Sequence, residues 1–508
     1  MFSILIEWLN SWSGVMSVLI GALTLCMVVY RYWWKLPHPR FPPGVRGIPI
    51  LGATPFFGRY PQETIAKWSR EKYGPVMSVR FGQQDAVVLN DYESIHEALV
   101  KNINVFHTRP SCSIVECFTE GYGFGFADGH KKYLEVRNFS LAALRGLGMG
   151  RHSMEMRVSG VAQDLVQRLE DCRGQPTDVK MLIGSTVCNV ISSVVFGKSY
   201  DYDDKAFQYA VQCSFDCFGD PENSEYLNVL FFYPKLRFFP PFKRALEKFI
   251  KVHQGLIDFN QKEIEEHEKN LDENEPADFI DAFLIEMKKH SPDTTWFHKT
   301  QLLHCLCDMF VAGTETSTNT ILWSMLALIH FPEVQQNIYK EIHKVLGEHV
   351  IPSADHGDKL PLLRAFIQEL YRYRTIVPMS LQHRASEDVE IGGYLITKDT
   401  TVSTNIDAIH QDEKLFKNPK EFNIYRHIEG GKFVFNKKII PFGIGARSCL
   451  GEKLAKLEIF IFLANIIRRF EILPDPKSKC LPPFKDGISG LLYVPFRFKM
   501  VAKPRLVN

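Results

Sequence analysis

The segment LLHCLCDMFVAGTETSTNTILWSMLALI, residues 302–329, restricts the fold more than any other part of the chain. It is mostly apolar and has almost no polar face, so a helix built from it must be covered by protein on every side. Its polar residues gather in the middle, in AGTETS from Ala312 to Ser317. Polar groups inside an apolar helix cost free energy unless they are satisfied or used. We therefore predict a long helix through the centre of the molecule, with a functional site halfway along it.

The segments around this helix indicate a mainly α protein with small β-sheets. Helical patterns dominate from about residue 92 to residue 374, and a last helix is predicted at about 450–470. The alternating segment VMSVRFGQQDAVVLN, residues 76–90, predicts a β-hairpin, and residues 389–405 predict further strands. The chain has 508 residues, of which 45% are hydrophobic, and this is enough for a large core.

The amino terminus predicts a membrane anchor. No charged residue lies between Glu7 and Arg31, and the span 8–30 is long enough to cross a bilayer about 30 Å thick. Basic residues follow the span, which predicts that the rest of the chain lies in the cytosol. A cleaved signal peptide is the alternative, but such a peptide carries its basic residues before the apolar run.

Three parts of the chain are predicted from these patterns: an anchor in residues 1–35, a proline-rich hinge in 36–52, and one large domain in 53–508. Proline and glycine exclude a helix from the hinge. The aromatic segment NVLFFYPKLRFFPPFKR, residues 228–244, has two interpretations. It is either a core segment with a turn or an apolar patch that dips into the membrane near the anchor.

Charge and cysteine content argue against two kinds of function. A net charge of +2 gives no support to a nucleic-acid partner. The 11 cysteines form no CxxC pair, which argues against a zinc site or a redox dithiol. Their number and scatter suit a reducing compartment.

One cysteine nevertheless has an unusual setting, in PFGIGARSCLGEKLAK, residues 441–456. Gly443 and Gly445 let the backbone turn tightly and approach a ligand closely. Phe442 can pack against a flat ring, and Arg447 can pair with an anionic group on the same ligand. Cys449 stands at a predicted helix start, where unpaired N–H groups and the helix dipole favour a thiolate.

The segment FGIGARSCLG, residues 442–451, resembles the F-x-x-G-x-R-x-C-x-G loop of the cytochromes P-450, which are haem-thiolate monooxygenases. The resemblance implies the cytochrome P-450 fold, one large two-lobed domain, and haem b as the cofactor. It implies that Cys449 is the axial iron ligand and that Arg447 binds a haem propionate. Thiolate ligation favours cleavage of the O–O bond.

The central AGTETS segment is similar to the family's A/G-G-x-D/E-T-T/S pattern. Ala312 and Thr316 share a helix face, and the small side chains of Ala312 and Gly313 leave room above a flat cofactor. The resemblance implies that Thr316 and Glu315 relay protons to iron-bound oxygen. The structural alternative is that the Thr316 hydroxyl only bonds to the Ala312 carbonyl and bends the helix.

Two further stretches resemble the family. In ELYR, Glu369 and Arg372 match its buried E-x-x-R pair, and the resemblance implies that Arg426 braces this pair. The family has P-E-R-F around that arginine, whereas this chain has Ile424, Tyr425 and His427, which leaves the geometry of the loop open.

YLEVRNF, residues 133–139, is similar to W-K-x-x-R-R-F. Tyr133 and Arg137 lie one helical turn apart, so both can reach a propionate. His383 matches a position at which the family often binds a propionate through His or Arg, and a structural histidine is the alternative.

The resemblance also implies partners and a location. Microsomal members receive electrons from NADPH-cytochrome P-450 reductase, in some cases with cytochrome b5, and they use O₂ and a lipophilic substrate at the endoplasmic reticulum membrane. Basic residues around the cysteine loop are predicted to attract an acidic electron donor. They are Lys437, Lys438, Arg447, Lys453 and Lys456.

The sequence thus predicts a membrane-anchored monooxygenase that hydroxylates or epoxidises a steroid, a fatty acid or a xenobiotic. It does not distinguish among these substrates. Two alternatives stay open: a haem-thiolate isomerase or lyase that needs no external electrons, and a non-catalytic haem-binding protein.

Overall fold

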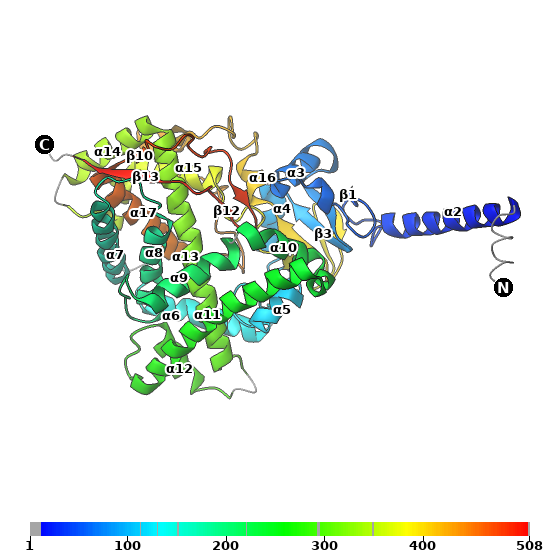
Figure 1. Ribbon diagram of the computed structural model, residues 1–508, viewed down its shortest axis with the longest axis horizontal. Helices are drawn as coiled ribbons and strands as arrows, with labels where there is room; N and C mark the ends of the chain where they lie inside the picture. The colour runs from blue at the N-terminus through cyan, green and yellow to red at the C-terminus, as the bar shows by residue number, and fades with distance from the viewer. Residues whose placement is uncertain are drawn as a thin grey trace.

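The computed structural model describes residues 12–111, 113–129, 131–149, 152–219, 221–291, 295–347 and 350–505. Residues 1–11, which include the start of the predicted anchor, lie outside the described residues. Helices make up most of the body, and the largest sheet lies at the end of the body from which the amino-terminal helix projects (Figure 1). The prediction of a mainly α fold with small β-sheets is confirmed.

The α-helices have the following bounds: α2 (Trp12–Trp34), α3 (Pro61–Trp68), α4 (Tyr92–His96), α5 (Ser113–Thr119), α6 (Lys131–Gly146), α7 (His152–Asp171), α8 (Lys180–Val195), α9 (Lys205–Gly219), α10 (Pro221–Phe232), α11 (Pro240–Asn270), α12 (Phe279–Met287), α13 (Lys299–His330), α14 (Pro332–Leu346), α15 (Pro361–Tyr373), α16 (Ile406–His410) and α17 (Glu452–Arg469). Short 3₁₀ turns include η4 (Pro234–Phe238) and η6 (Ile424–His427).

The strands are β1 (Gly44–Val45), β2 (Val76–Phe81), β3 (Gln84–Leu89), β4 (His383–Arg384), β5 (Val389–Ile391), β6 (Tyr394–Ile396), β7 (Thr401–Thr404), β8 (Ile428–Glu429), β9 (Lys432–Phe433), β10 (Phe470–Pro474), β11 (Ile488–Ser489), β12 (Tyr493–Val494) and β13 (Met500–Pro504).

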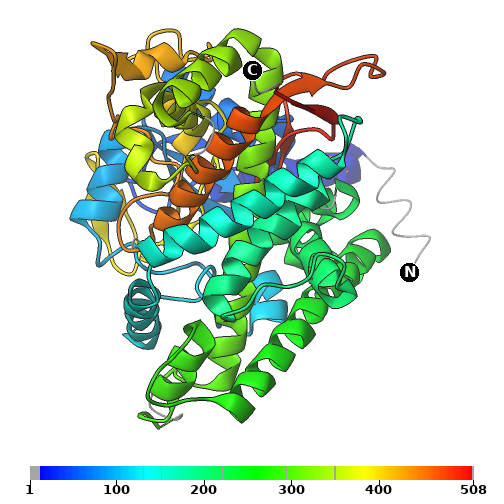
Figure 2. The ribbon, with the colours of Figure 1, turned by 90° about the vertical axis from the view of Figure 1, so that its left-hand side faces the viewer.

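Helix α13 runs through the body, as its apolar sequence predicts (Figure 1). His298 caps its amino end by accepting a hydrogen bond from the N–H of Gln301, and the helix ends just before Phe331 and Pro332, where a proline cannot continue it. It packs against α8, α9, α11 and α17. Helices α7 and α17 lie side by side on one flank of the body (Figure 2). Because helices surround α13, the polar residues in its middle lie deep inside the molecule.

The largest sheet joins distant parts of the chain in the order β1-β2-β3-β7-β4. Strands β2 and β3 pair antiparallel, with Val76 opposite Leu89, so the predicted hairpin is confirmed. Strand β3 then pairs parallel to β7, with Ala86 opposite Thr401. This pairing fixes the start of the chain to the region that follows α15.

The predicted hinge is packed against this sheet along part of its length. Strand β1 pairs parallel to β2, and the ring of Phe41 is buried. Residues 36–52 therefore do not form a free linker, although they contain no helix, as predicted. The division of the chain at residues 35 and 52 stays a prediction.

Helix α2 projects from the body as a separate rod (Figure 1). Its window Gly14–Arg31 is long and apolar enough to cross a membrane, and only 6% of that window is buried. An exposed apolar helix is costly in water, whereas the buried α13 is not.

The aromatic segment combines both predicted interpretations. The Phe232 ring stacks on Phe81 of β2, and the Tyr233 hydroxyl donates to the carbonyl of Leu51 at 2.6 Å, so this part is anchored to the body. By contrast, Phe238 and Phe239 are exposed. An apolar patch therefore lies next to the segment that connects the body to α2.

Candidate active site

The loop before α17 approaches another part of the backbone so closely at one position that only glycine fits there. Gly443 and Gly445 have positive φ angles of 68° and 85°. A Cβ atom on Gly445 would lie 2.1 Å from the carbonyl oxygen of Leu99, so a side chain there is excluded. The N–H of Cys449 donates to the carbonyl of Phe442 at 2.9 Å and closes the loop. The loop thus holds Cys449 two residues before Gly451, the N-cap of α17.

The thiol of Cys449 is accessible by surface area but largely desolvated by its surroundings. This burial raises the pKa of the thiol. The N–H groups of Gly451 and Glu452 act in the opposite direction and lower this pKa. The N–H groups at the helix start thus favour the thiolate, as predicted, but desolvation outweighs them, so they do not by themselves keep Cys449 ionised. A metal cation held by Cys449 would supply the missing positive charge, since a ligating thiol is deprotonated outright.

Two buried arginines, Arg109 and Arg137, and the half-buried Arg447 surround the same loop. Arg447 donates to the carbonyls of His107, Phe124 and Ala127, and Arg137 donates to the carbonyl of Ser448 at 2.5 Å. Arg109 donates to the carbonyls of Gly125, Leu381 and Gln382. Among the described residues, no carboxylate forms an ion pair with any of the three guanidinium groups; from Arg109 the nearby Asp128 accepts only the backbone N–H, at 3.1 Å, and its side chain pairs with Arg384. Burial and the charge of Arg447 lower the pKa of Arg109 to about 9.

Tyr133 and His383 complete this cluster. The Tyr133 ring is fully buried and lies 3.8 Å from the Arg447 guanidinium, and its hydroxyl donates to the carbonyl of Phe124. The Nδ1 atom of His383 lies 2.7 Å from the carbonyl oxygen of Phe106. Burial and the nearby Arg109 hold the pKa of His383 well below its usual range. His383 is thus neutral in this strongly cationic surrounding.

This cluster fits a dianionic ligand. Buried cations without counter-ions are costly, and two carboxylates would neutralise them. The two propionates of a haem are such carboxylates, and the cysteine lies on the same loop as Arg447. The residues present therefore fit the haem that the sequence implies. Arg109, which the sequence analysis did not single out, belongs to the cluster. The signal for it was the stretch FHTRP, residues 106–110, whose arginine has no local partner in the sequence.

Two residues in the middle of α13 are accessible although most of this helix is buried. Ala312 is exposed and Thr316 is half-buried, although residues on both sides of them are buried. The Thr316 hydroxyl donates to the Ala312 carbonyl at 2.7 Å, as the structural alternative predicts. Its oxygen still has lone pairs that accept hydrogen bonds from the open side. The local hydrogen bond and a role in the cavity are therefore compatible.

Gly313 does not leave room above a cofactor. A Cβ atom at this position would lie 2.5 Å from Cδ1 of Ile191 on α8. The expectation for Gly313 is wrong because this glycine is on the face of α13 that packs against α8. Ala312 alone supplies the open position.

Glu315 points away from Thr316. Its two carboxylate oxygens are buried and have no hydrogen-bond partner among the described residues. Burial raises its pKa to about 8, the charge of Lys180 opposes this shift, and Asp216 adds to it. Lys180 starts α8 and Asp216 lies on α9, so the carboxyl group faces these helices. No hydrogen bond therefore joins the side chains of Glu315 and Thr316.

A second buried acid lies behind α13, and the sequence analysis missed it. Glu458 on α17 is fully buried, and burial raises its pKa to about 8 while a hydrogen bond from Ser317 lowers it. One of its carboxylate oxygens has no partner among the described residues. In the sequence it looks like one more acidic residue of an amphipathic helix, so no local signal identifies it.

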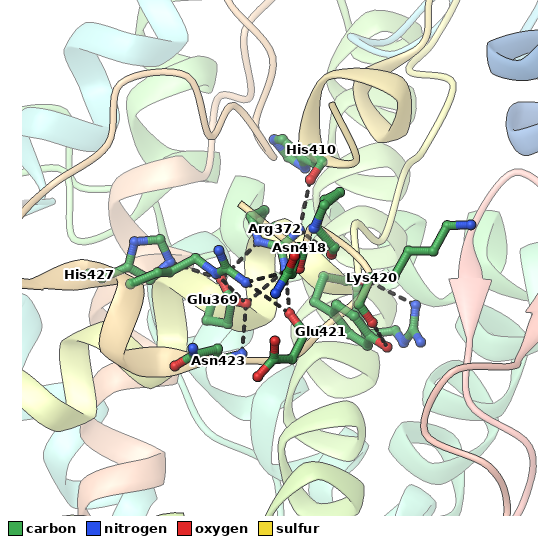
Figure 3. Close-up of polar contacts among 12 residues, drawn as sticks. Glu369, Arg372, His410, Asn418, Lys420, Glu421, Asn423 and His427 are labelled. Atoms are coloured by element: carbon green, nitrogen blue, oxygen red, sulfur yellow. Dashed lines mark hydrogen bonds and ion pairs between the residues drawn. The ribbon is translucent and has the colours of Figure 1, made fainter. Parts of the chain in front are cut away.

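The predicted bracing pair is confirmed as a buried network. Arg372 donates to both carboxylate oxygens of Glu369, at 2.8 and 2.7 Å, and Arg426 donates to one of them at 3.0 Å. The side chains of Arg372 and His427 converge on Glu369 (Figure 3). Burial would raise the pKa of Glu369, but these hydrogen bonds lower it to about 2. Arg372 also donates to the carbonyls of His410 and Pro419, so α15 is tied to the chain before the cysteine loop.

The predicted basic surface around the loop is smaller than its sequence suggests. Arg447 is turned into the arginine cluster and is not part of an outer face. Lys456 pairs with Glu452 at 2.6 Å, and Lys438 pairs with Glu93. Lys437 and Lys453 are the remaining cations of the predicted surface.

Comparisons with known proteins agree with this geometry. The family model described as Cytochrome P450 matches residues 42–500. The chain is 33% identical to cytochrome P450 2C3 from Oryctolagus cuniculus, over 92% of this chain and 96% of that protein. It is 34% identical to cytochrome P450 2C16 from the same species, over 96% and 99% of the two chains. It is 32% identical to cytochrome P450 2B4, also from that species, over 89% and 92%.

Proposed function

The chain belongs to the cytochrome P450 family, and on this premise we propose that Cys449 is the axial ligand of its haem and that α13 carries the proton-transfer residues. The protein is a haem-thiolate monooxygenase, an oxidoreductase that acts on lipophilic substrates with O₂. Its cofactor is haem b. When bound, this group supplies the activation of O₂ and the transfer of one oxygen atom.

We assign the arginine cluster to the haem propionates. Arg109, Arg137 and Arg447 supply charge, and Tyr133 stacks on Arg447 and holds its guanidinium in place. His383 is neutral next to these cations, and the negative charge of a propionate favours its protonated, donating form. Phe442, Gly443 and Ala312 line the space for the macrocycle. This assignment explains why three arginine side chains, two of them buried, occur together without ion-pair partners.

For proton delivery, we propose that the Thr316 hydroxyl accepts hydrogen bonds in the active-site cavity. We propose that Glu315 gains and loses protons on the side of α13 that faces α8 and α9. The Thr316 hydroxyl is fixed by its bond to Ala312, so its lone pairs have one orientation. Glu315 has a pKa of about 8, so it gains and loses a proton near neutral pH. Its buried carboxyl group has no hydrogen-bond partner among the described residues, so no hydrogen bond has to break when it exchanges a proton.

Glu369, Arg372 and Arg426 have a structural role in this proposal. Their network fixes the chain around Pro419 and Asn423, ahead of the loop that carries Cys449.

The observation that carries the proposal is the group of three arginines without ion-pair partners, Arg109, Arg137 and Arg447, around the loop that holds the exposed Cys449. The test is the carbon-monoxide spectrum of the reduced, purified protein. Wild type is expected to show the red-shifted band of a thiolate-ligated haem. Cys449→Ser is expected to lose the band, whereas Cys480→Ser, a change at another exposed cysteine, is expected to keep it. A wild-type spectrum without the band would reject Cys449 as the ligand.

The electron source and the membrane attachment complete the proposal. Family members of the microsomal type imply a reductase partner, and we propose NADPH-cytochrome P-450 reductase with cytochrome b5 as a second donor. We propose that α2 crosses the endoplasmic reticulum membrane once, with the body on the cytosolic side. The exposed Phe238 and Phe239 then dip into the same membrane and place the entry of a steroid, fatty acid or xenobiotic near the lipid.

The alternatives are not favoured by the family comparisons. An isomerase or a haem carrier does not consume NADPH in the presence of reductase. Oxidation of NADPH that is coupled to an oxygenated product would therefore separate the monooxygenase from both. Addition of a substrate panel, followed by the haem spectral shift, would identify the substrate class.

A further inference from the structure

The junction between α2 and the body contains a pocket that none of the proposed haem-site residues lines. It has a volume of about 490 Å³ and is lined by Trp33, Lys35, Leu36, Pro37, Arg80, Gln83 and Asp85. Trp33 and Lys35 come from the end of α2 and the residue after it, and the others from the hinge and the β2–β3 hairpin. We propose that this pocket binds the phosphate headgroup of a membrane phospholipid.

The first argument is an unsatisfied donor in the pocket wall. Trp33 is 7% exposed, and its indole N–H has no acceptor among the described residues. The Nε–H of Arg46, a buried side chain in the same junction, also has none. Buried N–H groups are rarely left without a partner. Arg46 does not line the pocket, whereas Trp33 does, so an oxygen acceptor of a bound ligand would serve the Trp33 indole N–H.

The second argument is the charge of the junction. Arg80 donates two hydrogen bonds to Asp85, at 2.8 and 2.7 Å, and Arg46 pairs with the same carboxylate. The single charge of Asp85 is thus shared by two arginines, while the Lys35 ammonium has no ion-pair partner among the described residues. Three cations face one anion, which leaves two positive charges and favours an anionic ligand such as a phosphodiester.

The third argument is the position of the pocket relative to the membrane. This argument rests on the proposed membrane attachment. The candidate span ends at Arg31, two residues before Trp33. Headgroups lie directly outside the hydrocarbon core, so the pocket is at their level when α2 spans the bilayer. The acyl chains of a bound lipid can follow the exposed apolar side chains of α2, such as Leu25 and Val28.

The junction is also rigid enough to be a site. Arg80 lies 4.5 Å from the Trp33 ring and donates to the Trp33 carbonyl at 2.8 Å. Arg46 donates to the carbonyl of Lys35 at 2.9 Å. These bonds fix both walls of the pocket before a lipid arrives, so binding costs little ordering of the protein.

The test uses the full-length haem protein in a non-ionic detergent and follows its thermal unfolding midpoint. Three probes are added separately: dihexanoyl-phosphatidylglycerol, dihexanoylglycerol, which lacks the phosphate, and inorganic phosphate. We expect only the phosphatidylglycerol to raise the midpoint in a saturable way. An equal effect of dihexanoylglycerol would overturn the proposal, and an equal effect of inorganic phosphate would show a free-anion site and overturn the lipid assignment.

Matched variants locate the effect. Trp33→Phe keeps the ring but removes the N–H donor, and Trp34→Phe makes the same change at the neighbouring residue, which does not line the pocket. We expect Trp33→Phe to weaken the response to phosphatidylglycerol about tenfold and Trp34→Phe to leave it unchanged. Lys35→Gln is expected to weaken it as well. If phosphatidylglycerol raises the unfolding midpoint of Trp33→Phe and of Lys35→Gln at the same concentrations as that of wild type, the site is rejected.

Flotation with phosphatidylcholine vesicles separates this inference from the proposed membrane attachment. Wild type that floats but shows no phospholipid response rejects the pocket alone. Wild type that does not float rejects the membrane attachment on which the inference rests.

Discussion

The Nε2 atom of His427 lies 2.9 Å from Oε2 of Glu369, and both side chains are buried. The cytochromes P-450 that this chain resembles have a phenylalanine at the position of His427. In this chain the histidine joins the Glu369–Arg372–Arg426 network as a further donor. The altered segment from Ile424 to His427 therefore keeps the bracing arrangement that the sequence alone left open.

His427→Phe is expected to lower the stability of the protein by about 1–3 kcal/mol, because a buried carboxylate loses one of its donors. The three donors that remain, Arg372, Arg426 and the N–H of Asn423, are expected to keep the fold. Urea unfolding measures the effect. His427→Gln, which keeps an N–H donor, serves as the control and is expected to lose less. Equal stability of wild type and His427→Phe would show that the histidine adds nothing to the network.

Glu458→Gln is expected to stabilise the protein at pH 8 and to have little effect near pH 4. Burial raises the pKa of Glu458 to about 8 in the folded state from 4.5, so the folded state keeps a proton that the unfolded state releases. Wild-type stability therefore falls between pH 4.5 and 8, on the order of a few kcal/mol, and the variant lacks this loss.

The measurement is the thermal unfolding midpoint of the holoenzyme as a function of pH. Glu452→Gln on the same helix is the control, because Glu452 is an exposed partner of Lys456. The burial argument fails if the difference between wild type and Glu458→Gln does not grow from pH 5 to pH 8.

Arg109→Gln is expected to weaken haem binding by about 10- to 100-fold, since a buried charged donor to a propionate is lost. The rate of haem transfer to apomyoglobin measures this. Arg384→Gln is the matched control, because Arg384 pairs with Asp128 and Asp399 and is half-exposed. Equal transfer rates for wild type and Arg109→Gln would remove Arg109 from the propionate site.

Thr316→Ala is expected to retain haem but to divert consumed NADPH into hydrogen peroxide, because the cavity loses its fixed hydroxyl. Thr316→Ser is expected to recover most of the coupling. Thr320→Ala, one turn further along, removes a similar hydroxyl that bonds to the Thr316 carbonyl at 2.9 Å and is expected to stay coupled. The ratio of product to NADPH decides the question, and unchanged coupling in Thr316→Ala would count against the proton-transfer assignment.

Gly313→Ala is expected to destabilise the protein by about 1–3 kcal/mol, because its Cβ meets Cδ1 of Ile191 at 2.5 Å. The additional change Ile191→Ala is expected to restore part of the loss, since it removes the atoms in contact. Unfolding curves of the single and double variants measure this rescue. If the double variant loses as much stability as the two single variants lose together, Gly313 faces the cofactor space and not α8.

The sequence by itself determined the central helix, the hairpin, the cysteine loop, the Glu369–Arg372 pair and the family. Each depends on residues that are close together in the chain: an apolar run, an alternation, or a motif whose spacing the backbone turns into a local geometry. The pairing of Tyr133 with Arg137 could also be predicted from the sequence, because one helical turn separates the two residues.

Only the tertiary structure decided how these parts meet. In the tertiary structure Arg109 lies near Arg447, and the Glu458 carboxyl group accepts a hydrogen bond from Ser317. Gly313 packs against α8, and the Arg447 side chain points into the arginine cluster and not toward the outer surface. It also showed that burial outweighs the helix start at Cys449 and that Trp33 leaves an N–H donor without an acceptor. Burial and long-range electrostatics depend on which segments pack together, and this depends on contacts between residues hundreds of positions apart.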